Sequence, residues 1–274
     1  MTPAGTPPPD SAGPPPPDPA GSRHAEPLRG EELSAAFDHA ARRYDRLVAV
    51  NPGYHAHLRR SARRLRLPGD GARLRLLDLG CGTGASTAAL LRAAPLAAIT
   101  AVDASAGMLA RALAKRWPPN VRFVHAPVER IAEAGLGGRY DAAFAAYLFR
   151  NVGDPDAVLA AVRTLLRPGG RLAVHEYTLS GGPSARLVWT VVHRAVVLPL
   201  GTLMGDGGLY RHLGRSVAEF DTVDAFAARM RRAGFDRVRS APMPGWQTGI
   251  VHTVVGSAPE TAAPTRRAGG GAAG

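Results

Sequence analysis

Apolar positions recur with two periods between about residues 31 and 256 of the chain. A spacing of three to four residues indicates a helix, and a short continuous apolar run indicates a buried strand. The helical spacing is seen at Phe37, Ala41, Tyr44 and Val48. It predicts helices over 31–50, 55–66, 85–94, 105–116, about 154–166, about 183–213 and 222–233. Strands are predicted over 74–79, 99–102, 121–124, 140–147, 171–175, 236–240 and 247–256.

Local signals mark several boundaries of these elements. Asp154 is expected to cap a helix that has Pro155 at its first position, and Arg167-Pro168-Gly169-Gly170 is expected to form a turn. Strands that alternate with helices at this spacing predict a parallel sheet covered by helices on both faces. Ligands of such sheets bind at the carboxyl ends of the strands, so chemistry is expected there.

Both ends of the chain have a different composition. Residues 1–27 are rich in Pro, Gly, Ala and Asp and hold too few apolar side chains to offset the entropy of ordering. We expect a disordered tail there, partly in the polyproline II conformation, and a second one over 259–274. The folded domain is therefore predicted over 28–258.

The formal net charge of +12 is only weak evidence for a nucleic-acid partner. Lys115 is the only lysine, and an excess of arginine over lysine is typical of a GC-rich genome. The clustered basic face and the aromatic platforms of nucleic-acid binding are mostly absent, so no nucleic-acid partner is expected. Attraction to anionic lipid stays open.

Cysteine usage and hydropathy bear on the compartment. Cys81 is the only cysteine, so no intrachain disulfide is possible, which fits a reducing cytoplasm. The N-terminus lacks the pattern of a signal peptide. The apolar stretch 187–204 contains His193, Arg194 and Pro199, and we do not interpret it as a membrane span.

The most informative motif is Asp78-Leu79-Gly80-Cys81-Gly82-Thr83-Gly84, after the first strand. Glycine is needed where the backbone turns sharply or approaches a ligand. The dinucleotide fingerprint has its third glycine one position later, and the acid at 78 suits an ammonium or sulfonium better than a pyrophosphate. Asp103 ends the next strand, where a carboxylate can accept from ribose hydroxyls. The alternative is a tight turn beside a surface Asp, and Cys81 is expected to contribute backbone only.

Five further segments carry a resemblance. They are residues 37–45 (Phe-Asp, Ala, Tyr-Asp), 149–152 (Phe-Arg-Asn-Val), 166–172 with Glu176, 210–213 with Ser216, and 233–235. With the glycine loop, they make residues 31–256 resemble the ubiquinone/menaquinone biosynthesis C-methyltransferases, which are class I S-adenosylmethionine-dependent enzymes. The resemblance implies an α/β, Rossmann-like, mostly parallel seven-stranded sheet with an N-terminal helical cap and a helical lid over about 183–213.

The resemblance also implies S-adenosylmethionine as cofactor. Its binding positions would be Asp78, Gly80, Gly82, Thr83, Asp103, Met108, Pro127, Val128 and Ala146. Pro127 stands where the family has a polar residue, and Ala146 where a Ser is frequent. Because Pro127 can neither donate from its backbone nor accept through a side chain, the adenine would use a neighbouring carbonyl or water, with a weaker affinity or an unusual substrate as the consequence.

The implied reaction is methylation of an aromatic carbon beside a hydroxyl, in a prenylated quinol such as demethylmenaquinol or a related lipophilic phenol. Such a site needs a base or a cation that stabilises the phenolate. Arg150, Asn151 and Tyr44 are the expected catalytic residues. Arg150 would stabilise phenolate or orient a water, Asn151 would fix its geometry, and Tyr44 and Tyr147 would offer aromatic faces to the sulfonium.

Purely structural roles remain as alternatives for these residues. Arg150 could pair with Asp154 or Asp156, and Tyr147 could belong to the core. Three histidines are candidate bases without support from spacing, and each is expected to be structural. They are His175, His193 and His252. No group of side chains has metal-ligand spacing, so no metal is expected.

Two other functions remain as alternatives: an O- or C-methyltransferase of a small natural product, and a non-catalytic nucleotide-binding protein. The helix predicted over 55–66 carries Arg59, Arg60, Arg63 and Arg64 on one broad face. This face would hold a cytoplasmic enzyme at the anionic inner surface of the cell membrane, or would simply be solvated. A homodimer is a further open possibility.

Overall fold

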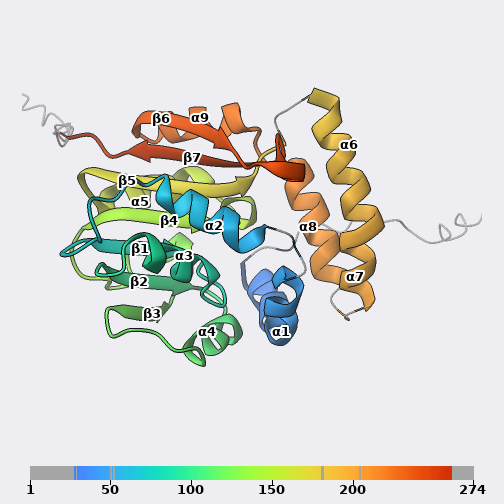
Figure 1. Cartoon of the computed structure of the whole chain (residues 1–274), viewed down its shortest axis with the longest axis horizontal. Coiled ribbons are helices and arrows are strands. Elements are labelled where there is room, and N and C mark those ends of the chain that lie inside the picture. The colour runs from blue at the N-terminus through green and yellow to red at the C-terminus, as the bar shows by residue number, and fades with distance from the viewer. Residues whose placement is uncertain are drawn as a thin grey trace, which may run out of the picture.

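The computed structural model describes residues 28–260 apart from positions 29, 50, 52, 180, 181, 204 and 206. Within this part of the chain, seven strands form one sheet in the order β3-β2-β1-β4-β5-β7-β6 (Figure 1). The strands are β1 (Arg75–Leu79), β2 (Ala98–Asp103), β3 (Val121–His125), β4 (Tyr140–Ala146), β5 (Leu166–Tyr177), β6 (Asp236–Pro242) and β7 (Val251–Ser257). The first five pair in parallel and β7 is antiparallel to both neighbours, which confirms the predicted sheet.

Helices cover both faces and one end of the sheet. They are α1 (Gly30–Ala49), α2 (Tyr54–Arg63), α3 (Ala85–Ala93), α4 (Ala106–Leu113), α5 (Pro155–Leu165), α6 (Gly182–Val192), α7 (Leu198–Leu203), α8 (Gly207–Glu219) and α9 (Val223–Arg232). The short turns are η1 (Val128–Arg130), η2 (Phe149–Asn151), the π-helical η3 (His193–Val197) and η4 (Gly245–Gln247). As predicted, Asp154 caps α5 through the backbone N–H of Ala157, and Pro155 begins the helix.

Side chains that alternate between the two faces of the sheet form two hydrophobic cores, one on each face. Leu77 and Leu79 of β1 pack with residues of α5 and α9, whereas Leu76 packs with residues of α2 and α3. Successive side chains of a strand point to opposite faces, so a strand buried on both faces reads as a continuous apolar run. This arrangement leaves the carboxyl ends of β1, β2, β4 and β5 as the edge where ligands can reach the sheet.

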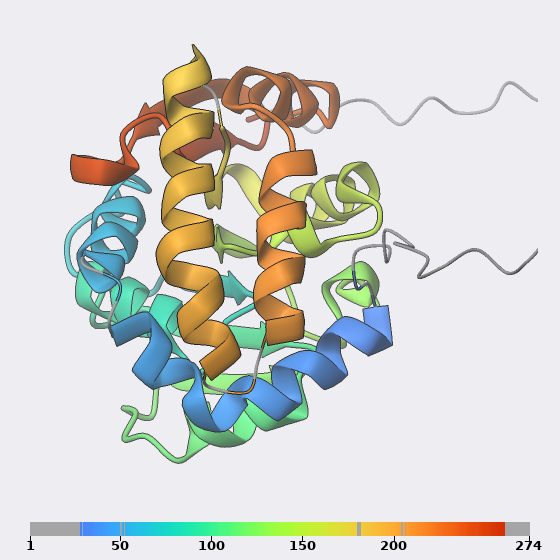
Figure 2. The same cartoon turned by 90° about the vertical axis from the view of Figure 1, so that its right-hand side faces the viewer.

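That edge is closed by two groups of helices. α1 contacts α4 and α8 there, and α6, η3, α7 and α8 form a helical layer beyond β4 and β5 (Figures 1 and 2). Figure 2 faces this layer, with α6 and α8 crossing in front of the sheet and α1 running along its lower margin. These are the N-terminal cap and the helical lid implied by the resemblance.

Three boundaries differ most from the prediction. The expected turn at 167–170 is the extended start of β5, because Gly169 and Gly170 exchange backbone hydrogen bonds with Ala258. The lid helix α8 continues to Glu219 instead of ending near 213, since Ser216 and Val217 are buried against the domain. β7 begins at Val251 rather than 247, after a turn in which Gly249 has φ +77°.

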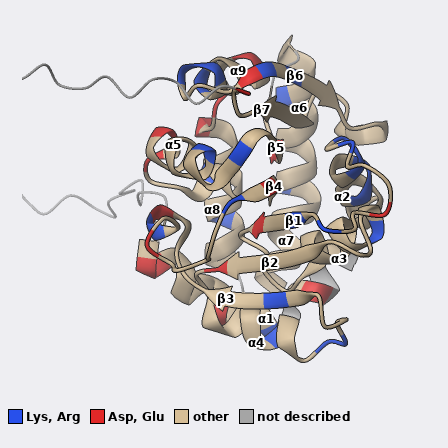
Figure 3. Ribbon diagram, turned by 90° about the vertical axis from the view of Figure 1, so that its left-hand side faces the viewer, with Lys and Arg blue, Asp and Glu red and all other residues tan. Residues whose placement is uncertain are grey.

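The predicted arginine face on α2 is only partly formed. Figure 3 shows basic residues along α2, and Arg60 and Arg63 are exposed. Arg64 instead turns toward the sheet and donates to the carbonyls of Ala241 and Pro242. The predicted tails, 1–27 and most of 259–274, lie outside the described residues. None of the helices of the described part is both long and apolar enough to cross a bilayer.

Candidate active site

The glycine loop and the acid that ends β2 are in direct contact. Gly80, Gly82 and Gly84 all have positive φ, the region that favours glycine. The backbone N–H of Gly82 donates to Asp103 Oδ2 over 2.7 Å, and the Ser105 N–H donates to Oδ1 over 2.9 Å. A Cβ on Gly84 would come within 2.6 Å of the Trp117 ring, whereas one on Gly82 would meet nothing within 4 Å. The loop is therefore closely packed against Trp117 at Gly84 and has open space next to Gly82.

Asp78 lies beneath the loop with 0% of its surface exposed. Its Oδ2 accepts from the hydroxyls of Ser86 and Thr87 over 2.8 and 2.6 Å. Its Oδ1 is buried and has no hydrogen-bond partner among the described residues. Burial raises the pKa of Asp78 to about 7, although the two hydroxyls oppose the shift. A buried carboxylate oxygen without a partner is the feature that a ligand ammonium would complete.

Two aspartates attach α1 to this region, and the sequence did not single them out individually. Asp45 accepts from the Thr83 hydroxyl over 2.5 Å and pairs with Lys115 over 2.9 Å. Asp38 accepts from the Ser105 hydroxyl and from the backbone N–H of Gly107. The signal was present in the Phe-Asp and Tyr-Asp pattern of residues 37–45, whose two acids are seven residues apart on one face of α1.

The other predicted cofactor positions lie along the same edge of the sheet. Met108 is buried in the first turn of α4, where its N–H donates to Ser105 Oγ. Pro127 follows β3 and precedes η1, and Val128 packs in the core. Ala146 ends β4. These positions gather where the adenosine of a nucleoside cofactor would lie over the sheet.

A cavity of about 360 Å³ lies next to the cap and under the lid. Aromatic rings from α1, α2, the ends of β4 and β5 and the lid line it, together with aliphatic side chains of the lid. The aromatic residues include Tyr44, Tyr54, Tyr147, Tyr177 and Trp189, and the aliphatic residues include Val192, Val196, Val197 and Leu200. A wall of this kind fits a lipophilic ligand with an aromatic ring. Tyr147 is thus part of the cavity wall, stacked at 5.7 Å on Tyr54, and not merely core.

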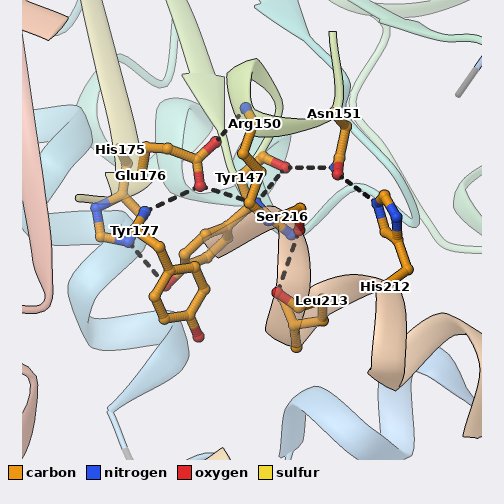
Figure 4. A network of polar contacts seen from close by, with 9 residues as sticks. All are labelled: Tyr147, Arg150, Asn151, His175, Glu176, Tyr177, His212, Leu213 and Ser216. Atoms are coloured by element: carbon orange, nitrogen blue, oxygen red, sulfur yellow. Dashed lines mark hydrogen bonds and ion pairs between the residues drawn. The ribbon is translucent and has the colours of Figure 1, made fainter. Parts of the chain in front are cut away.

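A buried cation, the Arg150 side chain of η2, lies in the wall of this cavity, which also contains Asn51 and His212. Arg150 Nη1 donates to Glu176 Oε1 over 2.8 Å and to the carbonyl of Tyr147 over 2.7 Å (Figure 4). The Arg150 and Glu176 side chains are 8% and 1% exposed. Burial lowers the pKa of Arg150, but Glu176 outweighs it and the net shift is upward. The suggested pairing with Asp154 or Asp156 is therefore wrong, because β5 brings Glu176 closer.

Part of the guanidinium is left for a ligand. Arg150 Nε is buried without a partner among the described residues. The same cation lies 5.6 Å from the ring centroids of both Tyr147 and Tyr177. A fixed cation with an unfilled donor, held between two aromatic rings, can bind a phenolate oxygen.

Asn151 is held from two sides. Its Nδ2 donates to the Tyr147 carbonyl over 3.2 Å, and its Oδ1 is 3.0 Å from His212 Nε2 (Figure 4). The backbone N–H of Leu28 donates to His212 Nδ1 over 3.1 Å, so the neutral ring carries its proton on Nε2 and donates it to Asn151. No individual role was predicted for His212, which belongs to the segment 210–213 of the resemblance and lies on α8, far from η2 in the chain.

None of the three candidate histidine bases reaches the cavity as a free base. His175 is buried, and burial lowers its pKa to about 3. His252 is hydrogen-bonded to the Thr178 hydroxyl, and burial also lowers its pKa. His193 bonds the Tyr210 carbonyl. Cys81 is 3% exposed, and burial raises the pKa of its thiol well above the usual range, which is consistent with a backbone role only.

Comparison with known proteins decides what kind of enzyme this is. The profile of the ubiE/COQ5 methyltransferase family matches residues 26–256. The chain belongs to the ubiE/COQ5 methyltransferase family. It is an S-adenosylmethionine-dependent methyltransferase, and the alternative of a non-catalytic nucleotide-binding protein falls away.

Relatives of this methyltransferase match over most of their length. It is similar to a ubiquinone/menaquinone biosynthesis C-methyltransferase UbiE of Syntrophotalea carbinolica, with 33% identity over 79% of this chain and 91% of the relative. It is also similar to a demethylmenaquinone methyltransferase of Thermus thermophilus, with 36% identity over 73% of this chain and 90% of the relative.

Solved structures share the fold of this methyltransferase. One is an S-adenosylmethionine-dependent methyltransferase of Thermotoga maritima, with TM-score 0.58, 19% identity, and coverage of 82% of this chain and 99% of the other. Another is the 1,6-didemethyltoxoflavin-N1-methyltransferase of Burkholderia thailandensis, with TM-score 0.54, 23% identity, and coverage of 83% and 87%. At these identities the likeness speaks for the fold alone.

The residues present fit S-adenosylmethionine. The unpartnered Asp78 Oδ1 matches an ammonium, the exposed backbone at Gly82 admits close approach, and each Asp103 oxygen retains a lone pair for a ribose hydroxyl. When bound, the cofactor supplies an electrophilic methyl group on a sulfonium. The cavity lined by Tyr44 and Arg150 adjoins this region, because Asp45, the residue after Tyr44, accepts from Thr83 of the glycine loop.

Proposed function

We propose that this methyltransferase methylates a ring carbon of a prenylated quinol, a demethylmenaquinol-like lipophilic phenol. The observation that carries the proposal is the cavity of about 360 Å³, which is lined by aromatic rings and by aliphatic side chains of the lid and has the buried cation of Arg150 in its wall. A quinol ring fits among the aromatic residues and its prenyl chain fits among the lid aliphatics. The names of the relatives from S. carbinolica and T. thermophilus support the same substrate class.

The reaction places clear demands on the site. A quinol hydroxyl loses its proton, the adjacent ring carbon forms a bond to the methyl carbon, and the methyl–sulfur bond breaks. The hydrogen on that ring carbon then leaves as a proton and the ring becomes aromatic again. The site must hold the carbon in line with the methyl group, exclude water and stabilise the negative oxygen.

In this proposal Arg150 stabilises the phenolate. Its raised pKa keeps it charged, so it acts as a cation and not as the base. Glu176 and the Tyr147 carbonyl hold the guanidinium through Nη1, and Nε keeps a hydrogen that no described residue accepts. Asn151, locked by His212, fixes the turn from which Arg150 projects. Tyr44 covers the acceptor from α1.

Methyl transfer from labelled S-adenosylmethionine to reduced demethylmenaquinone in detergent, with the product mapped by mass spectrometry, tests the proposal. We expect a label on a ring carbon, and loss of at least 99% of the rate in Arg150→Met with unchanged cofactor affinity. A label on oxygen, or turnover of small polar phenols only, would favour the alternative of a natural-product methyltransferase.

Peripheral contact of this cytoplasmic enzyme with an anionic membrane belongs to the same proposal. The lid exposes apolar side chains on the side away from the cavity, with Leu203 84% and Leu187 65% exposed. Arg186 in α6 and Arg194 in η3 are exposed as well. An apolar face flanked by arginines suits an anionic lipid surface, from which a prenylated acceptor could pass beneath the lid.

Flotation with vesicles of phosphatidylglycerol or of phosphatidylcholine tests this contact. We expect binding to the anionic vesicles, a loss of binding in Leu203→Asp, and little change in Arg60→Gln on α2. Equal recovery with both lipids, or none, would reject the contact. A concentration-dependent mass in sedimentation that Leu203→Asp abolishes would instead identify the lid as the face of a homodimer.

A further inference from the structure

A chain of side-chain hydrogen bonds runs from Arg64, after α2, to Tyr147 in the cavity wall. Arg64 Nη1 donates to Thr253 Oγ1 over 2.7 Å. Thr253 Oγ1 is 2.7 Å from Ser61 Oγ, and Ser61 Oγ is 2.8 Å from His175 Nδ1. His175 Nε2 is 3.0 Å from the Tyr147 hydroxyl. The three middle residues are almost completely buried, so water does not interrupt the chain.

Arg64, at one end of this chain of hydrogen bonds, fixes which atom donates and which accepts in each of them. A guanidinium only donates, so Thr253 Oγ1 accepts from Arg64. The Thr253 hydroxyl proton has Ser61 Oγ as its acceptor among the described residues. Ser61 then donates to His175 Nδ1, which must be unprotonated. A buried neutral imidazole carries its single proton on the other nitrogen, and Nε2–H therefore donates to the Tyr147 oxygen.

The Tyr147 hydroxyl consequently has its own proton to give. Within the described part of the chain, no other side chain accepts this proton, and the Tyr147 ring lines the acceptor cavity. The ring is fixed between Tyr54 and Tyr177, at centroid distances of 5.7 and 5.0 Å. Its backbone has φ +57° and is bonded to the His175 carbonyl, so a second contact holds it to the same strand.

We propose that the Tyr147 hydroxyl is a fixed hydrogen-bond donor to an oxygen of the methyl acceptor, and that Arg64, Thr253, Ser61 and His175 are positioning residues that orient it. The inference rests on the proposed function, because it assigns Tyr147 to the quinol of that reaction. Together with Arg150, the hydroxyl would stabilise the negative charge on the oxygen next to the reacting carbon. Acceptors that lack an oxygen at this position would bind poorly, since the donor would be left unpaired.

The direction of the chain is measurable without any substrate. In ¹⁵N-detected NMR of the ligand-free protein, we expect His175 as the Nε2–H tautomer, and a change toward Nδ1–H in Ser61→Ala, where Nδ1 loses its donor. Thr178→Val is the matched control, because it removes another buried Thr–His hydrogen bond outside the chain. A Nδ1–H tautomer in the wild-type protein would overturn the proposal, whatever the substrate is.

Kinetics test the consequence for the acceptor. Tyr147→Phe keeps the ring and removes the donor, so kcat should fall by about tenfold or more while the Kd of S-adenosylmethionine stays the same. The acidic limb of the kcat–pH profile should move about one unit upward, because phenolate is less stabilised. Ser61→Ala should shift the limb likewise, and the double variant should be no worse than Tyr147→Phe.

An unmoved limb in Ser61→Ala, or additive losses in the double variant, would contradict the orienting role. The Thr178→Val control should retain the wild-type profile. If the wild-type protein methylates no quinol at all, the proposed function fails, whereas the tautomer measurement still decides the direction of the hydrogen bonds. The two failures can therefore be told apart.

Discussion

The two halves of the site are built in contrasting ways. At the half proposed for the cofactor, the backbone of the glycine loop and two carboxylates, Asp78 and Asp103, are the expected contacts and lie within about 26 residues of sequence. At the acceptor half, a cavity is assembled from side chains of the cap, β4, β5 and the lid. Backbone geometry permits little variation, whereas a side-chain wall can change with a few substitutions. The first half therefore marks the family, and the second half sets the acceptor.

The largest effect is expected where the cofactor half is most constrained. Asp103→Ala removes the acceptor of the Gly82 and Ser105 N–H groups together with the expected contact to ribose, and two or more charged hydrogen bonds are worth about 3 kcal/mol. We expect the Kd of S-adenosylmethionine to rise by at least 100-fold in calorimetry. Asp70→Ala, which removes a similar but exposed turn contact to Ala72, is the control. Unchanged affinity in the first variant would mean that this half has been misassigned.

In the acceptor half, the corresponding weak point is the buried ion pair. Glu176→Gln leaves the buried Arg150 without its counter-charge, which costs about 3 kcal/mol. Chemical denaturation should show that loss in the free energy of unfolding, and methyl transfer should fall as the guanidinium moves. Glu260→Gln removes an exposed pair with Arg237 and should change neither quantity. Equal stabilities of the two variants would imply that Arg150 is not dependent on Glu176.

The affinity for S-adenosylmethionine, measured over a pH series, should distinguish the cofactor half of the site from the acceptor half. Burial raises the pKa of Asp78 to about 7 from 3.8, so its contribution to folding stability is present below about 3.8 and is lost as the pH rises through about 7. Binding of an ammonium needs the ionised form, so the affinity for S-adenosylmethionine should increase by about tenfold between pH 5.5 and 7. Calorimetry of Asp78→Asn should show a weaker and pH-independent affinity. A flat profile in the wild-type protein would exclude Asp78 from contact with the ammonium.

The smallest change should come from Cys81, in the middle of the glycine loop. Its side chain is buried and its N–H bonds the Val102 carbonyl, so Cys81→Ala should alter cofactor affinity by less than about twofold. A thiol reagent should react with the unfolded chain and not with the folded one. Rapid labelling of the native protein would show that the loop opens, and would weaken the contrast between a rigid and an adaptable half.

The sequence anticipated these two halves unequally. The parallel sheet, and the glycine loop and Asp103 at its ligand edge, follow from period, glycine placement and strand ends, which are local signals, whereas the lid was implied by the resemblance. The partner of Arg150 was missed because Glu176 lies 26 residues away, across a helix. His212 meets Asn151 across 61 residues, and Ser61 meets His175 across 114. Such pairs depend on how the layers pack, which no periodicity reveals.

The attachment of α1 has a kinetic consequence. Asp38 holds the loop after β2, and Asp45 holds the glycine loop through Thr83 and Lys115. Because both aspartates belong to the same helix, undocking of α1 would loosen both loops together. Exchange of spent for fresh methyl donor would thus be coupled to a single concerted undocking, and its rate, rather than the bond-making step, could set the turnover of the enzyme.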